Sequence, residues 1–173
     1  ECQIKFKDVT VWKNEKWSLK SYFENCNVEI DDSVFCDCNI VAKNTEIKIK
    51  NSAVRPVGFC VVNAYNSNVT LNNVSVEGCD KEKRRPAIWS ENSRIITSNC
   101  TVTQPEYESA VYLIKNSYLQ SDDDDFESVC MDDSRGICTA SKIRNIFSAE
   151  SQSYVCMKEG MEILGNMSRK IDL

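Results

Sequence analysis

The stretch "NSNVTLNNVSV" at residues 66–76 and the stretch "NSRIITSNCTV" at residues 92–102 carry Asn, Ser, an apolar residue and a second Asn at the same offsets. Self-similarity at a spacing of roughly 20 to 50 residues is typical of a protein built from stacked structural repeats. Successive units of this chain begin 19 to 26 residues apart. The other units are "ECQIKFKDVTV" (1–11), "NCNVEIDDSVF" (25–35), "NTEIKIKNSAV" (44–54) and "NSYLQSDDDDF" (116–126).

Each unit predicts two strands that are separated by a bend. Small or apolar residues alternate with polar ones, as in Ser67, Val69 and Leu71, and this period of two indicates a strand with one buried side. The eighth residue is always Asp or Asn, which tolerate the left-handed backbone of a sharp bend. A further alternating strand precedes each unit, as in Val62 and Ala64. The repeat therefore predicts coils of three short strands, stacked about 4.8 Å apart into a parallel β-helix.

These units and their Asn ladder resemble the right-handed parallel β-helix superfamily, which has the pectin-lyase-like architecture. The resemblance covers residues 1 to about 126 and is to the architecture alone. The superfamily includes polysaccharide lyases and hydrolases, phage tailspikes, adhesins and secreted effectors, so the fold by itself does not assign a function. The expected fold class is all-β, a right-handed parallel β-helix of about six coils with a short α-helical C-terminal segment.

The chain is expected to divide near residue 130. Residues 1–130 are predicted to form the β-helix, and residues 131–173 a loop and a helical segment that caps the coil end or packs on a face of it. The helical prediction depends on apolar residues at helical spacing, among them Ile143, Ile146 and Phe147. Because the first unit begins in phase at residue 1 without a capping element, we expect a fragment of a larger protein with other domains.

Composition excludes several classes of partner. The 173 residues have a formal net charge of −5, which argues against an electrostatic nucleic-acid surface. No apolar run approaches the roughly 20 residues of a membrane-spanning helix, so no membrane insertion is expected. The chain has no His, which removes the commonest general base and the commonest metal ligand.

Carboxylates on the outward side of the third strand in each coil are the candidates for catalysis. Glu24 and Glu91 fall there, but three strand spacings separate them, about 14 Å, too far to share a cation or to act as a pair. The Asp run at residues 121–126 is interpreted as a solvated end of the regular stack. We therefore predict no catalytic residue, no metal site and no cofactor.

The same outward side predicts a binding surface. An apolar stripe there is expected to contact a protein or a glycan, and the basic run at residues 81–85 beside it would steer an acidic ligand. The alternative is that the C-terminal segment of the same chain covers the stripe. The predicted contact residues are Tyr22, Tyr65, Trp89, Leu113, Lys83, Arg84 and Arg85.

Ten Cys leave two interpretations open, a disulfide framework or buried thiols. Cys130 and Cys138 are expected in a loop or tail, where a disulfide would close a small ring, whereas five others are expected at inward or stacked positions that favour thiols. The bend residues Asn73 and Asn99 lie in sequons, but we expect their side chains to bond to the backbone. The inward or stacked residues are Cys2, Cys26, Cys38, Cys60 and Cys100.

The leading interpretation is a non-catalytic recognition domain of a secreted bacterial or viral protein, acting outside the cell or delivered into a host cell. The alternatives are a polysaccharide lyase or glycoside hydrolase, which the resemblance implies, and a structural stalk or scaffold that joins other domains.

Overall fold

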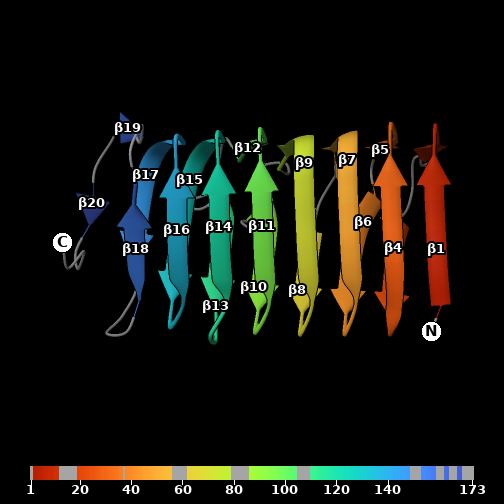
Figure 1. Cartoon of the computed structure of the whole chain (residues 1–173), viewed down its shortest axis with the longest axis horizontal. Coiled ribbons are helices and arrows are strands. Elements are labelled where there is room, and N and C mark those ends of the chain that lie inside the picture. Colours follow the sequence, from red (N-terminus) through yellow and green to blue (C-terminus); the bar gives the residue numbers. More distant parts are fainter. Residues whose placement is uncertain are drawn as a thin grey trace.

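The computed structural model describes residues 2–11, 19–36, 38–55, 62–78, 86–104, 110–148, 153–158, 162–163 and 167–168. Over these residues the chain is a parallel β-solenoid, and its strands lie side by side along the long axis (Figure 1). The N-terminal strand lies at one end of the stack and the last strands lie at the other (Figure 1). The predicted all-β, parallel β-helical architecture is confirmed. No helix in the described part has the length and apolar content that a membrane crossing requires.

Equivalent strands of successive coils pair with one another and form three faces. The first face contains β1 (Cys2–Lys7), β4 (Cys26–Asp31), β7 (Glu46–Arg55), β9 (Asn68–Glu77), β11 (Arg94–Ser98), β14 (Tyr118–Asp122), β16 (Arg135–Thr139) and β18 (Tyr154–Met157). The second face contains β2 (Thr10–Val11), β5 (Val34–Cys36), the ends of β7 and β9, β12 (Thr101–Thr103), the beginnings of β15 (Asp125–Asp132) and β17 (Lys142–Ser148), and β19 (Glu162–Ile163). The third face contains β3 (Leu19–Glu24), β6 (Cys38–Lys43), β8 (Val62–Tyr65), β10 (Ile88–Glu91), β13 (Val111–Ile114), the ends of β15 and β17, and β20 (Met167–Ser168).

The core consists of ladders of like side chains between the three faces. One such ladder runs through Val28, Ile47, Val69, Ile95 and Leu119, which are in register on successive strands of the first face. Each of these side chains is at most 1% exposed. Burial of an aliphatic side chain contributes about 1.5–3 kcal/mol, so the stacking of coils supplies the main favourable term of folding.

Left-handed residues form the bends, as the recurring Asn and Asp predict. The bend residues have φ between 47° and 62°, a region where Asn and Asp cost less than other residues with a Cβ. The first bend, between the third and first faces, uses Asn25, Asn44, Asn66, Asn92, Asn116 and Asp133. The second bend, between the first and second faces, uses Asp8, Asp32, Asn51, Asn73, Asn99, Asp123 and Ala140.

A ladder of inward hydroxyl groups explains why Ser follows Asn at the first bend. The backbone N–H of Ser67 donates to the Oγ of Ser93 at 3.0 Å, and that of Ser93 donates to the Oγ of Ser117 at 3.2 Å. Each hydroxyl also donates to a nearby carbonyl, as Ser93 does to Glu91 O at 2.7 Å. Because these groups are buried, an unpaired one would cost about 1–3 kcal/mol. The Ser ladder therefore satisfies the backbone where the chain turns.

The Asn side chains of the bends form a second kind of ladder, which lies on the surface. Nδ2 of Asn73 donates to Oδ1 of Asn51 at 3.0 Å, and Nδ2 of Asn99 donates to Oδ1 of Asn73 at 3.3 Å. These side chains are exposed. The expectation that Asn73 and Asn99 bond to the backbone is therefore wrong, because their side-chain amides bond to the Asn side chains of neighbouring coils instead.

The stack also continues beyond residue 130, where a loop and a helix were expected. Strand β16 pairs with β14, β17 pairs with β15, and β18 pairs with β16. The helical prediction is therefore wrong for residues 142–148 and 154–157 and for the short strands β19 and β20. Most of the remaining residues of the predicted helical segment lie outside the described part of the chain. The physical reason is that parallel pairing with the preceding coil satisfies this backbone, whatever the spacing of its apolar residues.

Ala140 provides a test of the bend. It is the only bend residue in the described part of the second bend without an Asn or Asp side chain, and its φ is 50°. A left-handed residue with a Cβ costs about 1–2 kcal/mol. We expect Ala140→Asn to raise the free energy of unfolding by about 1 kcal/mol, measured by urea denaturation, because Asn tolerates this backbone and extends the surface ladder beside Asp123.

Ala140→Gly is the matched control, because it relieves the same backbone without adding an amide. We expect it to stabilise less than Asn, since Gly gains more freedom in the unfolded chain. A lower stability for both variants would contradict this account of the bend.

Candidate functional site

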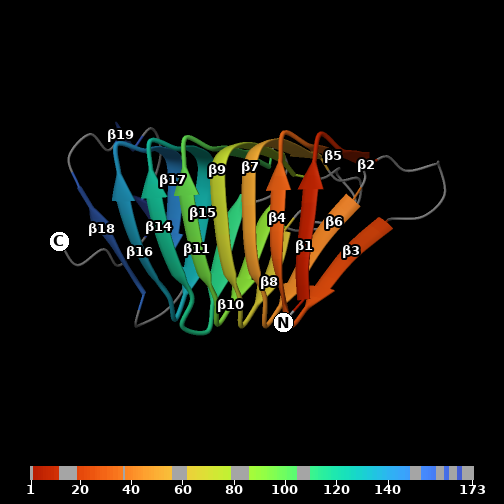
Figure 2. The same cartoon turned by 45° about the vertical axis from the view of Figure 1, so that its right-hand side comes forward.

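The outward side of the third face carries a row of side chains that strand register brings together. Tyr22 is in register with Val41, Val41 with Asn63, Asn63 with Trp89, and Trp89 with Tyr112. Five neighbouring strands, β3, β6, β8, β10 and β13, each supply one member. In Figure 2 the third-face strands β3 and β6 slope away from the first-face strands β1 and β4. We call this row the aromatic row.

Two members of the aromatic row form a packed pair. The ring centroids of Trp89 and Tyr112 lie 5.2 Å apart, and the rings are inclined at 70° in an edge-to-face arrangement. Such pairs contribute about 0.5–1.5 kcal/mol beyond the area that they bury. The pair holds the two half-buried side chains in place, so little conformational entropy remains to be lost when another molecule contacts them.

The indole Nε1 of Trp89 is buried and has no hydrogen-bond partner in the described part of the chain. A buried donor without an acceptor costs about 1–3 kcal/mol, and buried indole N–H groups usually find one. The packing of the described residues does not explain this orphan donor.

Tyr22 lies at the other end of the row and is 53% exposed, a high value for so large a ring. Its neighbour Lys43 forms an ion pair with Glu24, with 2.8 Å between Nζ and Oε1. Hydrogen bonding to Glu24, the charge of Glu24 and the nearby Tyr22 together raise the pKa of Lys43. Lys43 therefore stays charged and points its ammonium group at two fixed partners.

A second ion pair lies beside the Trp89 end of the row. Nζ of Lys115 lies 2.6 Å from Oε1 of Glu91. Exposed pairs of this kind contribute only about 0–1 kcal/mol to stability. Within each pair the two charges offset each other, so the described border of the aromatic row consists of paired polar groups.

The structure places some of the predicted contact residues on the outward side of the third face and one of them in the core. Tyr22 and Trp89 lie in the aromatic row as predicted, and Tyr65 lies in the adjacent outward row, in register with Glu91. Leu113 does not lie on the surface, because its side chain is fully buried and in register with the inward Ser90. Lys83, Arg84 and Arg85 lie outside the described residues.

One extra residue explains the error at Leu113. Most first bends contain a single left-handed residue, but Lys115 and Asn116 both have positive φ, 51° and 62°. Glu91 is in register with Ile114, whereas the N–H of Ser93 donates to Ser117, so Lys115 is an insertion between them. Counting back from Asn116 therefore places the residues of β13 one position out of register. A shift of one residue exchanges the inward and outward sides of a strand. Tyr112 is the surface residue that the sequence pattern missed.

A second group of reactive side chains lies inside the solenoid. Asp124 is 3% exposed, and its carboxylate accepts hydrogen bonds from Thr97 Oγ1 at 2.6 Å, Ser121 Oγ at 2.6 Å and Cys100 N at 2.7 Å. A fourth bond comes from the backbone N–H of Asp122 at 3.1 Å. Burial raises the pKa of Asp124, although these hydrogen bonds act in the opposite direction. The preceding Asp122 and Asp123 are exposed, so the Asp run does not converge on one point.

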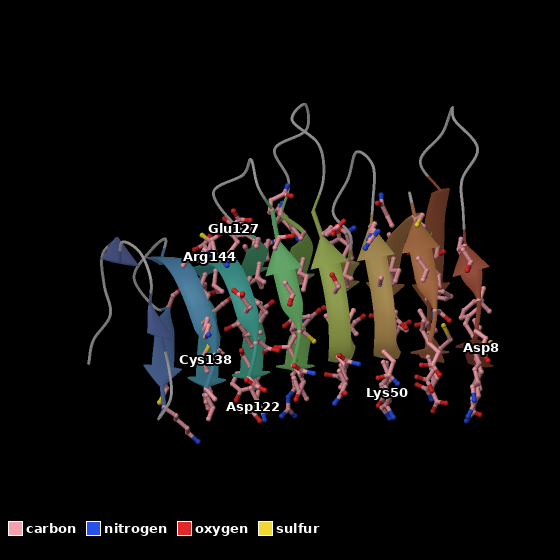
Figure 3. The ribbon with its side chains drawn as sticks, turned by 90° about the horizontal axis from the view of Figure 1, so that it is seen from above. Asp8, Lys50, Asp122, Glu127, Cys138 and Arg144 are labelled. Carbon is pink, nitrogen blue, oxygen red and sulfur yellow. The ribbon has the colours of Figure 1, made fainter. Side chains whose placement is uncertain are left out.

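The thiols near Asp124 are poor nucleophiles. Burial is the main cause that raises the pKa of Cys100 to about 11 and that of Cys138 to about 12, and the charge of Asp124 adds to both shifts. Nucleophilic cysteines need the opposite shift. Cys138 lies toward the C-terminal end of the stack (Figure 3). Because Cys130 and Cys138 belong to β15 and β16 and are buried thiols, the loop that was expected to hold them is not present.

The described residues contain no group of three or more His, Cys, Asp or Glu side chains that could hold a metal ion. Figure 3 shows charged groups on separate edges instead, with Asp8, Lys50 and Asp122 along one edge and Glu127 and Arg144 near the opposite one. Arg144 is paired there with Asp125 at 3.2 Å.

Comparison with known proteins gives no match to a family model, to a curated protein or to a solved structure.

The buried carboxylate predicts a pH dependence of stability. Because the pKa of Asp124 is raised on folding, its contribution is most favourable below the ordinary Asp pKa of about 3.9 and becomes less favourable as pH rises through the raised value. Asp124→Ser cannot titrate, and it restores the residue found at the equivalent positions Ser33, Ser52 and Ser141. We expect the stability of the wild type relative to this variant to fall as pH rises, measured by urea denaturation across a pH series.

Asp122→Ser is the control, because Asp122 is exposed and its removal should leave the pH dependence close to that of the wild type. If wild type and Asp124→Ser give parallel curves across the acid range, Asp124 does not titrate differently in the folded and unfolded states.

Proposed function

We propose that this chain is a non-catalytic recognition domain that binds a protein partner through the aromatic row of its third face. The observation that carries the proposal is the row itself, in which strand register aligns Tyr22, Trp89 and Tyr112 on one outward side. A solenoid does not need large aromatic side chains on its outer surface, because its core is filled from the inward side.

The shape and composition of the row favour a protein over a small molecule. Small molecules bind concave sites, whereas in-register strands present a broad surface. Tyr and Trp are enriched at the centres of protein interfaces, and polar groups form the rim. The ion pairs Lys43–Glu24 and Lys115–Glu91 supply such a rim.

The orphan indole N–H supports the same proposal. A backbone carbonyl of a partner is a suitable acceptor for Nε1 of Trp89, provided that binding rearranges the groups that bury this donor. Pairing this donor would recover the free energy that the free domain loses by burying it. Trp89 is therefore the expected centre of the interface.

We infer further that the domain belongs to a secreted bacterial or viral protein, and that its solenoid is of the right-handed, pectin-lyase-like kind. The confirmed parallel solenoid and the Asn ladders support this inference. The carboxylates of the third face that an enzyme would use, Glu24 and Glu91, are each engaged with a lysine. The lyase, hydrolase and stalk alternatives have no observation of comparable weight in their favour.

The proposal is tested with Trp89→Ala. Proteins retained by the immobilised chain are identified by mass spectrometry, purified and titrated against wild type and variant. We expect the dissociation constant of the true partner to rise about 30-fold, the equivalent of about 2 kcal/mol, because an interface centre is lost.

Tyr118→Ala is the matched control. Tyr118 is also a half-buried aromatic residue, but it belongs to the first face and packs under Arg94, whose guanidinium lies 5.5 Å from the ring centroid. Partner affinity should survive this change. Equal binding by wild type and Trp89→Ala would contradict the proposal, and a glycan array that detects sugar binding lost in Trp89→Ala would replace the protein with a glycan.

A further inference from the structure

Two cysteines face each other across the first pair of strands. Strand β1 is parallel to β4, and its register places Cys2 directly opposite Cys26. Both are free thiols in the structure. No other pair of cysteines is in register between strands within the described part of the chain.

The spacing of parallel strands suits a cross-link at this position. Opposed residues on neighbouring strands lie about 4.8 Å apart at Cα, inside the range of roughly 4.4–6.8 Å that disulfides span. The Cβ atoms of a disulfide approach to about 3.8 Å, so the two chains must move about 1 Å closer at Cys2. Cys2 is the first residue of β1, and the described pairing of β1 is with β4.

The two thiols differ in solvent exposure, and this difference sets the order in which they react with an oxidant. Cys2 is exposed, whereas Cys26 is 6% exposed and its Sγ lies 3.9 Å from Thr45 Oγ1 in the adjacent coil. A reagent in solution reaches Cys2, whereas Cys26 is shielded from solvent and lies in register with Cys2. Cys2 is suited to react with an oxidant in solution, and Cys26 is suited to displace the group that this reaction leaves on Cys2.

We propose that Cys2 and Cys26 form a redox-controlled disulfide that fastens the first strand of the solenoid to the second coil. A small-molecule disulfide, such as oxidised glutathione, is the oxidant. The Cys2 thiolate attacks one sulfur of that disulfide, its S–S bond breaks, and one small thiol leaves. The Cys26 thiolate then attacks the Cys2 sulfur of the mixed disulfide and displaces the second small thiol.

The reaction balances as a two-electron exchange. Two protein thiols become one disulfide, and one small disulfide becomes two small thiols, which carry the two protons. The consequence for the fold lies at β1, whose Ile4 and Phe6 are only half buried. In the reduced state parallel hydrogen bonds join β1 to β4, and in the oxidised state the disulfide adds a covalent link between the two strands.

The test is peptide mapping after equilibration of the folded chain with mixtures of reduced and oxidised glutathione. Free thiols are alkylated, and the chain is cleaved with trypsin and with a protease that cuts after Glu29, which separates Cys26 from Cys36 and Cys38. As the buffer becomes oxidising, we expect alkylation of Cys2 and Cys26 to be lost together and a peptide linking residues 1–5 to Cys26 to appear. Dithiothreitol should restore both thiols.

Two variants distinguish the proposal from nonspecific oxidation. In Cys26→Ser, Cys2 should stop at the mixed disulfide with glutathione, because the resolving thiol is missing. In Cys2→Ser, Cys26 should stay alkylatable, because no other thiol delivers the oxidant to it. The midpoint of thermal unfolding should rise on oxidation in the wild type and in neither variant.

The proposal is overturned if Cys2 of the wild type accumulates as the mixed disulfide while Cys26 remains free, or if the linked peptide joins either residue to a different cysteine. It is also overturned if the linked peptide forms only after the chain has been unfolded.

Discussion

The structure depends on a left-handed bend that recurs at the same two corners of every coil. Each bend turns the chain from one face to the next within one or two residues, and backbone groups at the bend pair with the neighbouring coil. At the first bend the pairing is made by Ser hydroxyl groups, as in the bond from Ser67 N to Ser93 Oγ at 3.0 Å. Bends of this kind satisfy one another only when they stack, so the local conformation and the long-range order of the solenoid are parts of one interaction.

This constraint separates the inner from the outer chemistry of the chain. Inward positions must be small, apolar or able to bond within the ladder, and even the carboxylate of Asp124 meets this condition through four donors. The cost of burying this carboxylate appears as a raised pKa of Asp124 and not as an unpaired charge. Outward positions carry no such condition, since solvent serves any polar side chain there. An aromatic row on the outer side of the third face is therefore not a requirement of folding, which is the reason to seek its explanation in binding.

Most of the coil could be predicted from the sequence because the bends mark their own positions. Asn and Asp at fixed offsets give the corners, and alternation between corners gives the inward residues, such as Val69 and Leu71. Two features of the structure could not be predicted in this way. Lys115 adds one residue to a bend, and a single residue is enough to exchange Leu113 and Tyr112 between core and surface. In the C-terminal part the apolar residues suggested a helix, whereas pairing with β15 makes residues 142–148 a strand.

The sequence by itself determined the all-β repeat, the bend residues and the outward placement of Tyr22, Tyr65 and Trp89, because these depend on local backbone preference and on a period of two. Only the tertiary structure decided that Tyr112 is the neighbour of Trp89, that the indole N–H has no acceptor among the described residues, and that Cys2 faces Cys26. Those facts follow from the register between coils, which is set by hydrogen bonds between strands that lie about twenty residues apart in the chain and that no local pattern records.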